Sequence, residues 1–318
     1  MATRVILDTD LAMGVPGSDI DDGFALALAV ADPAVRLEAI TTVNGNTDVE
    51  SAGLLTLELL SRLGREDIRV VRGAAAPLLT PDSARSAPES IRRGYGHRTP
   101  APGYAAAEIA RRVMASPGEI TLVAIGPLTN IAVALSLEPR LADTVKEIVV
   151  MGGVFLGHTN MQRMPGEFNI WVDPEAAAAV FRSGAPLRLV GLDVTLKVRM
   201  SRQDARRLQQ SGRPFAEFAG RCTDAWIDHM RDANPGDPAA ADSCALHDPL
   251  AMAAVTHPEL ITWRPAHVGV VTGPSIARGM TVADLLTSDS PPAANCSIAV
   301  DVDAAAFTDH FVEQISRL

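Results

Sequence analysis

Strand-like and helix-like segments alternate along most of this chain, and this alternation constrains the fold more than any other feature. Apolar runs rich in Val, Ile and Leu predict strands at residues 5–9, 37–43, 68–71, 120–125, 147–151 and 187–192. Helices are predicted at residues 22–31, 49–63, 104–115, 128–137, 174–183 and 214–231. Such an order predicts an α/β fold with a doubly wound, mostly parallel sheet and flanking helices.

The length and composition fit one large domain. Of the 318 residues, 47% are apolar, which is enough for a substantial core. Neither a linker-like stretch nor an internal repeat divides the chain, so we expect a single domain over residues 1–318. Residues 74–103 and 234–243 are expected to be irregular, and loops of this length often form lids or site walls.

Four aspartates near the start of the chain predict a cation site. Asp8 and Asp10 close the first strand, and Asp21 and Asp22 open the next helix. Clustered carboxylates repel one another unless a counter-charge lies between them, and their oxygens are the ligands that Ca²⁺ and Mg²⁺ prefer. Ligands in parallel sheets bind beyond the carboxyl ends of the strands, where Asp8 and Asp10 lie. Alone, each pair could equally be a turn or a helix cap.

Charge and cysteine usage exclude several classes of partner. The net charge of −10 argues against nucleic acid, because phosphate binding needs clustered Lys and Arg. No apolar run approaches the roughly 20 residues of a membrane helix. The three cysteines lack a CxxC spacing, and no signal peptide precedes the first strand, so we expect a soluble, cytoplasmic protein that binds a small molecule.

Further polar motifs follow the predicted strands. They are TVNGN at residues 42–46, GPLTN at 126–130, EFN at 167–169, DPEAA at 173–177 and HDP at 247–249. Together with the four aspartates, and in this order over nearly the whole chain, they resemble the inosine–uridine-type nucleoside hydrolase family. The resemblance implies hydrolysis of the N-glycosidic bond of ribonucleosides to free base and ribose, with a tightly held Ca²⁺, by a homodimer or homotetramer.

The resemblance also assigns roles around the cation. It implies that the ligands are the carboxylates of Asp10, Asp22 and Asp248 and the backbone carbonyl of Thr129. Three carboxylates around one divalent ion leave a negative site, which suits an oxocarbenium-like transition state. By the same resemblance, Asp10 is the general base toward a cation-activated water, and His247 protonates the leaving base. Asp8 orients its neighbours without binding the metal.

The substrate contacts are likewise implied by family positions. The residues that match positions around the substrate are Asp21, Asn46, Met151, Asn160, Glu167, Phe168 and Asn169. Acceptors on vicinal hydroxyls favour ribosides over deoxyribosides, because a missing hydroxyl leaves buried polar groups unpaired. Asn46 and Asn169 could instead satisfy their own loop backbone. The His–Asp pair favours members whose base preference is pyrimidine or broad.

Two segments depart from the family pattern. Residues 11–20 separate the two carboxylate pairs, and this loop is seven residues longer than in the family pattern. The inserted loop is expected to lie beside the ribose, so the site could accept a modified or enlarged sugar. In the stretch from 87 to 100, Arg93 takes the place of a histidine that many relatives have near the base. The candidate base-pocket residues are therefore Arg93, Tyr95, His97, Trp226 and His229. Packing or solvated surface roles are the alternative for these five.

Two other functions compete with this hypothesis. A haloacid-dehalogenase-like phosphatase would use the Asp8/Asp10 pair, but it needs Mg²⁺ and a downstream lysine, and neither Lys146 nor Lys197 has that setting. A non-catalytic nucleoside-binding protein is the second alternative. It is disfavoured because both the candidate base Asp10 and the candidate acid His247 are present.

Overall fold

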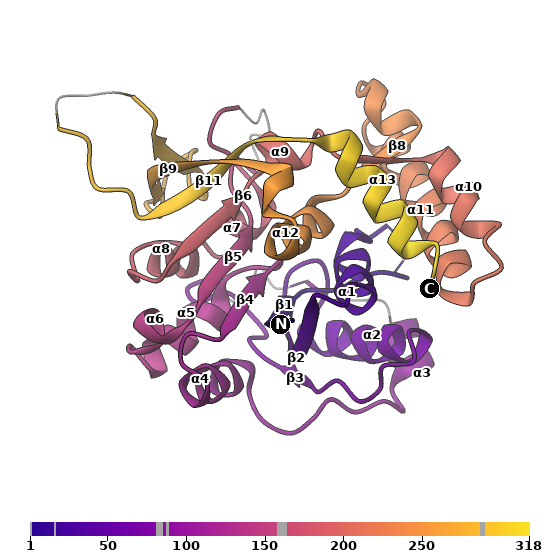
Figure 1. Ribbon diagram of the computed structural model, residues 1–318, viewed down its shortest axis with the longest axis horizontal. Helices are drawn as coiled ribbons and strands as arrows, with labels where there is room; N and C mark the ends of the chain where they lie inside the picture. The colour runs from indigo at the N-terminus through magenta and orange to yellow at the C-terminus, as the bar shows by residue number, and fades with distance from the viewer. Residues whose placement is uncertain (1, 16, 81–84, 87–88, 158–163, 287–289) are drawn as a thin grey trace.

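The computed structural model describes residues 2–15, 17–80, 85–86, 89–157, 164–286 and 290–318 (Figure 1). Its centre is a nine-stranded sheet with the order β10-β9-β11-β6-β5-β4-β1-β2-β3. These strands are β1 (Thr3–Thr9), β2 (Val35–Thr42), β3 (Val70–Arg72), β4 (Ile120–Ala124), β5 (Glu147–Met151), β6 (Leu187–Val190), β9 (Ile261–Val270), β10 (Thr281–Asp284) and β11 (Cys296–Val302). A separate antiparallel pair joins β7 (Arg199–Ser201) to β8 (Ser243–Ala245).

The sheet is parallel except around β9, which pairs antiparallel with both β10 and β11. The order β3-β2-β1-β4-β5-β6 reverses direction between β1 and β4, which are paired in parallel with Asp8 opposite Ala124. Helices on opposite faces leave a crevice at such a reversal, beyond the carboxyl ends of the strands. The predicted fold class, a doubly wound and mostly parallel α/β sheet, is confirmed.

Helices cover both faces of the sheet (Figure 1). The helices are α1 (Asp21–Ala31), α2 (Val49–Arg62), α3 (Glu89–Tyr95), α4 (Ala105–Ala115), α5 (Thr129–Leu137), α6 (Leu141–Thr144), α7 (Phe168–Val172), α8 (Pro174–Phe181), α9 (Leu192–Thr195), α10 (Arg202–Gln209), α11 (Pro214–Ala233), α12 (His247–Thr256) and α13 (Ala304–Ile315), with short 3₁₀ turns η2 (Pro238–Ala241) and η3 (Pro258–Leu260). None of the helices in the described ranges has the length and apolar character needed to cross a membrane.

Alternating side chains divide the interior into two cores. Val5 and Leu7 of β1 join a core with α1, α12 and α13, whereas Ile6 faces a second core with α4, α5 and α8. This alternation follows from the two-residue period of a strand. Both cores consist mainly of Ala, Val, Leu and Ile, as expected from the small share of aromatic residues.

The structure corrects two expectations about irregular segments. Helix α3 interrupts residues 74–103, and η2 together with the start of β8 interrupts residues 234–243. The sequence of α3 has little apolar periodicity, and only Ile91 of this helix is buried. A helix of this kind is hard to predict from sequence. Strand β9 lay outside the predicted set of strands. It contains Pro265 and several exposed positions, and both features weaken a strand pattern.

Candidate active site

A cavity of about 350 Å³ opens at the carboxyl ends of the central strands. Its wall is formed by side chains from α1, α7, α9, α11, α12 and the loops that follow β1, β2, β4 and β5. The residues that line it are Asp19, Asp21, Asn46, Ile125, Met151, Met164, Glu167, Phe168, Asn169, Leu192, Leu196, Met230, His247 and Asp248. Many of the predicted substrate-binding residues therefore share one cavity, although they are scattered along the sequence.

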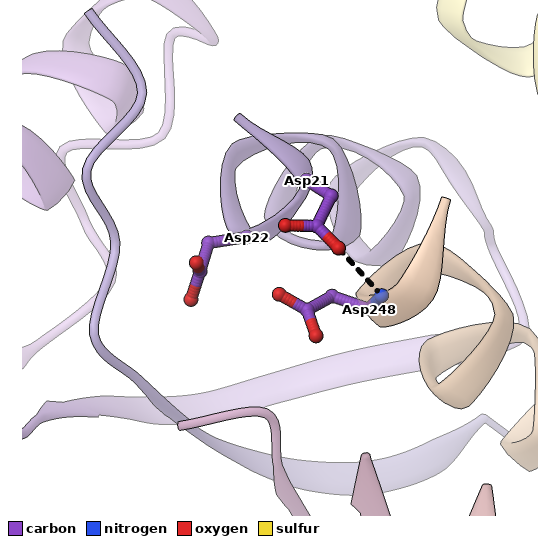
Figure 2. A group of neighbouring side chains, drawn as sticks. All are labelled: Asp21, Asp22 and Asp248. Atoms are coloured by element: carbon purple, nitrogen blue, oxygen red, sulfur yellow. Dashed lines mark hydrogen bonds between the residues drawn. The ribbon is translucent and has the colours of Figure 1, made fainter. Parts of the chain in front are cut away.

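Three carboxylates converge beside this cavity, and two of them, Asp21 and Asp248, line it (Figure 2). Asp21 and Asp22 come from the first turn of α1, Asp248 comes from the first turn of α12, and one oxygen of each lies within 4.8 Å of the others. The backbone N–H of Asp248 donates to Asp21 Oδ2 at 3.0 Å, which joins the two helix starts. Carboxylate oxygens gathered in this way are a donor set for a hard divalent cation.

Asp10 is held in a closed backbone cradle beside this cluster. Its Oδ2 accepts from the backbone N–H of Asn46 at 2.6 Å, while its buried Oδ1 has no hydrogen-bond partner among the described residues. A Cβ on Gly45 would lie 2.0 Å from Asp10 Oδ2, and one on Gly126 would lie 2.9 Å from Oδ1. Two loops therefore press their backbones onto one carboxylate whose remaining oxygen is unpaired, which fits a site for a cation.

Asp22 connects Asp10 to the cluster. Its Oδ1 accepts from the hydroxyl of Thr9, and its Oδ2 accepts from Nδ2 of Asn46 at 3.1 Å. Burial, and then the charge of Asp21, raise the pKa of Asp22 to about 7. Burial and the neighbouring carboxylates also raise the pKa values of Asp10 and Asp248 well above their ordinary range. These groups therefore lack a positive partner, and a divalent cation would supply one.

Asp8 lies apart from the cluster. Its Oδ1 accepts from the hydroxyl of Thr41 and from Nδ2 of Asn130 at 2.8 Å, and Asn130 also donates to the carbonyl of Thr42. Burial raises the pKa of Asp8 to about 7, although both hydrogen bonds lower it. Asp8 thus ties the ends of β1 and β2 to the start of α5.

Glu167 and Asn169 organise the opposite wall. Glu167 caps α7, and its carboxylate accepts from the backbone N–H groups of Gly153, Asn169 and Ile170. Asn169 donates through Nδ2 to the carbonyls of Ile125, at 2.9 Å, and Met151, at 3.2 Å. The ends of β4 and β5 are therefore tied to α7. Burial raises the pKa of Glu167 to about 7.

Phe168 separates the main cavity from a second one of about 230 Å³, and it lines both. The guanidinium of Arg85 lies over its ring, 4.6 Å from the centroid. Asn160, the remaining predicted sugar contact, lies outside the described residues.

His247 is the first residue of α12 and faces the main cavity. Its Nδ1 lies 2.7 Å from the hydroxyl of Thr195, at the end of α9. Burial lowers the pKa of His247, and Arg199 lowers it further, whereas the charge of Asp21 raises it. The apolar side chains of Leu192, Leu196 and Met230 line the same cavity as the imidazole. A neutral imidazole in such a setting can exchange a proton with a bound ring.

The structure does not bring Thr129 to the acidic cluster. Thr129 is the first residue of α5, so its carbonyl belongs to a helical turn, and its hydroxyl donates to Asp173 Oδ2 at 2.6 Å. Ile125, at the end of β4, lines the cavity instead. The GPLTN motif therefore follows a residue that lines the cavity, Ile125, but Thr129 itself is not among the lining residues.

The candidate base-pocket residues are dispersed. Arg93 and Tyr95 belong to α3, where Arg93 is exposed and pairs with Glu89. His97 lines a separate surface pocket with Arg98, so none of these three borders the main cavity. On α11, Trp226 and His229 stack with ring centroids 5.3 Å apart, but the neighbouring Met230 is the residue that reaches the cavity.

Comparisons with known proteins agree with this geometry. The family described as inosine-uridine preferring nucleoside hydrolase matches residues 5–309. A pyrimidine-specific ribonucleoside hydrolase, RihA, of Citrobacter koseri is 36% identical over 99% of both chains, and RihA of an Escherichia coli strain is 35% identical over the same shares.

Solved structures also resemble the chain over its whole length. A plant nucleoside hydrolase, PpNRh1, superposes with a TM-score of 0.88 at 30% identity, covering all of both chains. A purine-preferring ribonucleoside hydrolase from Gardnerella vaginalis has a TM-score of 0.85 at 29% identity, covering 99% of this chain and 98% of the other.

Proposed function

Because this chain belongs to the inosine-uridine preferring nucleoside hydrolase family, we propose that it cleaves pyrimidine ribonucleosides with the help of a bound Ca²⁺. The chain is a hydrolase that acts on N-glycosyl bonds of ribonucleosides. The observation that carries the proposal is the convergence of Asp21, Asp22 and Asp248, with Asp10 next to Asp22, at one end of the cavity that Asp21, Asp248 and His247 line. The phosphatase and the non-catalytic alternatives gain no support.

The proposed cation site uses the carboxylates of Asp10, Asp22 and Asp248. The backbone carbonyl of Ile125 takes the place first assigned to Thr129, since Ile125 lines the cavity at the end of β4. An all-oxygen donor set favours Ca²⁺ over softer metals. When bound, the cation acidifies and orients water and neutralises the clustered carboxylates.

Asp10 is the proposed general base. Its buried Oδ1, unpaired among the described residues, is available to take a proton from the attacking water. Water adds to C1′ of the sugar as the bond from C1′ to the base nitrogen breaks, and the transition state resembles an oxocarbenium ion. The surrounding carboxylates stabilise the positive charge that develops on the sugar.

His247 is the proposed general acid. The departing base carries the electron pair of the broken bond and needs a proton, which the imidazole donates. The hydroxyl of Thr195 at Nδ1 holds the ring, so that the other nitrogen, Nε2, is free to transfer the proton. Leu192, Leu196 and Met230 provide an apolar slot for a planar base at this end of the cavity.

The sugar contacts are proposed for Asp21, Asn46, Glu167 and Asn169, with Met151 and Phe168 packing against the ring. A pyrimidine preference rests on the names of the RihA relatives, and the excursion over residues 11–20 leaves open a modified or enlarged ribose. We also propose that the protein is a homodimer or homotetramer and that it is cytoplasmic. Light scattering of the purified protein can test the oligomeric state.

The direct test is release of free base by the purified protein from uridine, cytidine, inosine, guanosine, 2′-deoxyuridine and a 2′-O-methylated riboside. Each assay is run before and after treatment with a chelator strong enough to strip Ca²⁺, and again after Ca²⁺ is restored. Chelator-sensitive cleavage of uridine and cytidine, faster than of inosine, supports the proposal. Cleavage that survives complete removal of Ca²⁺, or the absence of cleavage from every riboside, contradicts it.

A further inference from the structure

Residues 11–15 and 17–20 form turns and irregular backbone, and several of their side chains are buried. Leu11, Met13 and Val15 are buried, and Met13 lies so close to Gly23 that a Cβ there would come within 2.5 Å of its sulfur. Gly17 has a φ of +76°, and a Cβ added there would lie 3.2 Å from the His229 ring of α11. The segment therefore holds its last residues in a defined position between α1 and α11.

This arrangement carries Asp19 into the main cavity, next to Asp21. Asp19 Oδ1 accepts from the backbone N–H of Ile20 at 2.7 Å, which fixes the carboxyl group. Among the described residues, neither Asp19 nor Asp21 forms an ion pair with Lys, Arg or His, and the two carboxyl groups hydrogen-bond to each other. The two neighbouring carboxyls thus offer acceptor oxygens to the cavity without a cationic side chain to satisfy them.

Asp19 has neighbours on two sides, the proposed sugar contact Asp21 and helix α11, on which its own segment packs. Residues 11–20 pack against α11, and α11 supplies Met230 to the apolar slot beside His247. The proposed sugar contacts Glu167 and Asn169 come instead from α7, on the opposite wall. An acceptor beside an otherwise apolar slot selects for a donor on the ring that occupies the slot.

We propose that Asp19 accepts a hydrogen bond from a ring N–H of the base and is a specificity-determining residue. This inference rests on the proposed function. In uridine the matching donor is N3–H, which is the only N–H of the uracil ring. Loss of that donor leaves a buried acceptor unpaired, which weakens binding of the substrate and of the transition state.

The test compares uridine with 3-methyluridine, in which a methyl group replaces the N3 hydrogen. Both are assayed with the wild-type holoenzyme and with Asp19→Ala, Asp19→Asn and Ser18→Ala. In Asp19→Asn the amide oxygen can still accept from the Ile20 N–H. Its NH₂ group is a donor, so it cannot accept a hydrogen bond from the substrate N–H. Ser18→Ala is the matched control, because Ser18 is in the same segment but lines a different cavity, between this segment and α11.

We expect the wild type and Ser18→Ala to prefer uridine in kcat/KM by roughly 10- to 100-fold. Both Asp19 variants should lose this preference through a rise in KM for uridine, with little change for 3-methyluridine and with unchanged Ca²⁺ content by elemental analysis. Equal losses on both substrates, or loss of Ca²⁺, would assign Asp19 to the sugar or to the cation and overturn the inference. Wild-type cleavage of both substrates at equal rates would also overturn it while leaving the proposed function intact. Cleavage of neither would instead refute the proposed function.

Discussion

The hydroxyl of Thr195 lies 2.7 Å from Nδ1 of His247 and joins the end of α9 to the first residue of α12. Nδ1 is therefore engaged within the protein, and Nε2 remains the nitrogen for proton transfer. A hydrogen bond to one ring nitrogen determines which nitrogen carries the proton. The orientation of the proposed acid thus depends on a residue outside the cavity wall.

Thr195→Val should remove this orientation without changing the shape of the buried side chain much. We expect kcat for uridine to fall roughly tenfold, because one hydrogen bond of about 1.4 kcal/mol is lost. KM should change little. The alkaline limb of the pH–rate profile, which reports the protonated acid, should shift, whereas Thr195→Ser, which keeps the hydroxyl, should restore the profile.

His247→Ala should affect substrates according to their leaving groups. Hydrolysis of uridine is expected to slow by roughly 10²–10⁴-fold, because the departing base is no longer protonated. p-Nitrophenyl riboside needs no protonation of its leaving group and should be hydrolysed at nearly the wild-type rate. Similar losses on both compounds would show that His247 acts in binding or in placing Asp248.

Asp10→Ala should abolish the proposed base while the protein still folds. The turnover of uridine should drop by roughly 10²–10⁴-fold. Removal of the buried carboxylate relieves repulsion within the cluster but leaves the backbone N–H of Asn46 without its acceptor, so we expect only a modest change in thermal stability in the absence of a cation. Circular dichroism and a melting curve in chelator check the fold. Near-normal turnover would remove Asp10 from the mechanism.

Ca²⁺ should stabilise the folded protein by binding to the carboxylate cluster. At a free Ca²⁺ concentration 100 times the Kd, the gain in unfolding free energy should be about 2.7 kcal/mol. Urea unfolding with and without Ca²⁺ measures this gain. Asp248→Asn should reduce it strongly, whereas Asp204→Asn, in α10, should not. An equal gain in both variants would place the cation elsewhere.

In the protein from which a chelator has removed the cation, Glu167 should lower the unfolding free energy as the pH rises. Its pKa is about 7 in the fold against an ordinary value of 4.5, so the folded state binds this proton more tightly than the unfolded chain. The resulting stability, roughly 3 kcal/mol, is present below pH 4.5 and is lost as the pH rises through 7. The pH dependence of urea unfolding should therefore be weaker in Glu167→Gln than in the wild type. Parallel pH curves would contradict this prediction.

The sequence predicted the parts of the site that depend on topology. Asp10 ends a strand, and Asp21 and Asp248 begin helices, so a parallel sheet brings them to one edge whatever the loops do. Family motifs added Asn46, Glu167 and Asn169, which the structure places around the same cavity. Strand alternation likewise led to the correct fold class.

The remaining parts depend on tertiary packing that no local pattern reports. Asp19 reaches the cavity only because residues 11–20 dock on α11, and Met230 does so only because α11 lies against them. Trp226 and His229 pack on that segment, although their aromatic character suggested a base pocket. Ile125 has an apolar side chain, so only the position of its backbone marks it as a site residue.

The cavity wall has two parts that come from different regions of the fold. The clustered carboxylates come from strand ends and helix starts of the central sheet, whereas Met230 and Asp19 come from a helix and a loop that pack on each other outside that framework. The backbone cradle around Asp10 is formed by Gly45, Asn46 and Gly126, none of which belongs to α11 or to residues 11–20. Changes in α11 or in residues 11–20 can therefore alter which substrates the enzyme accepts without altering the groups that break the N-glycosidic bond.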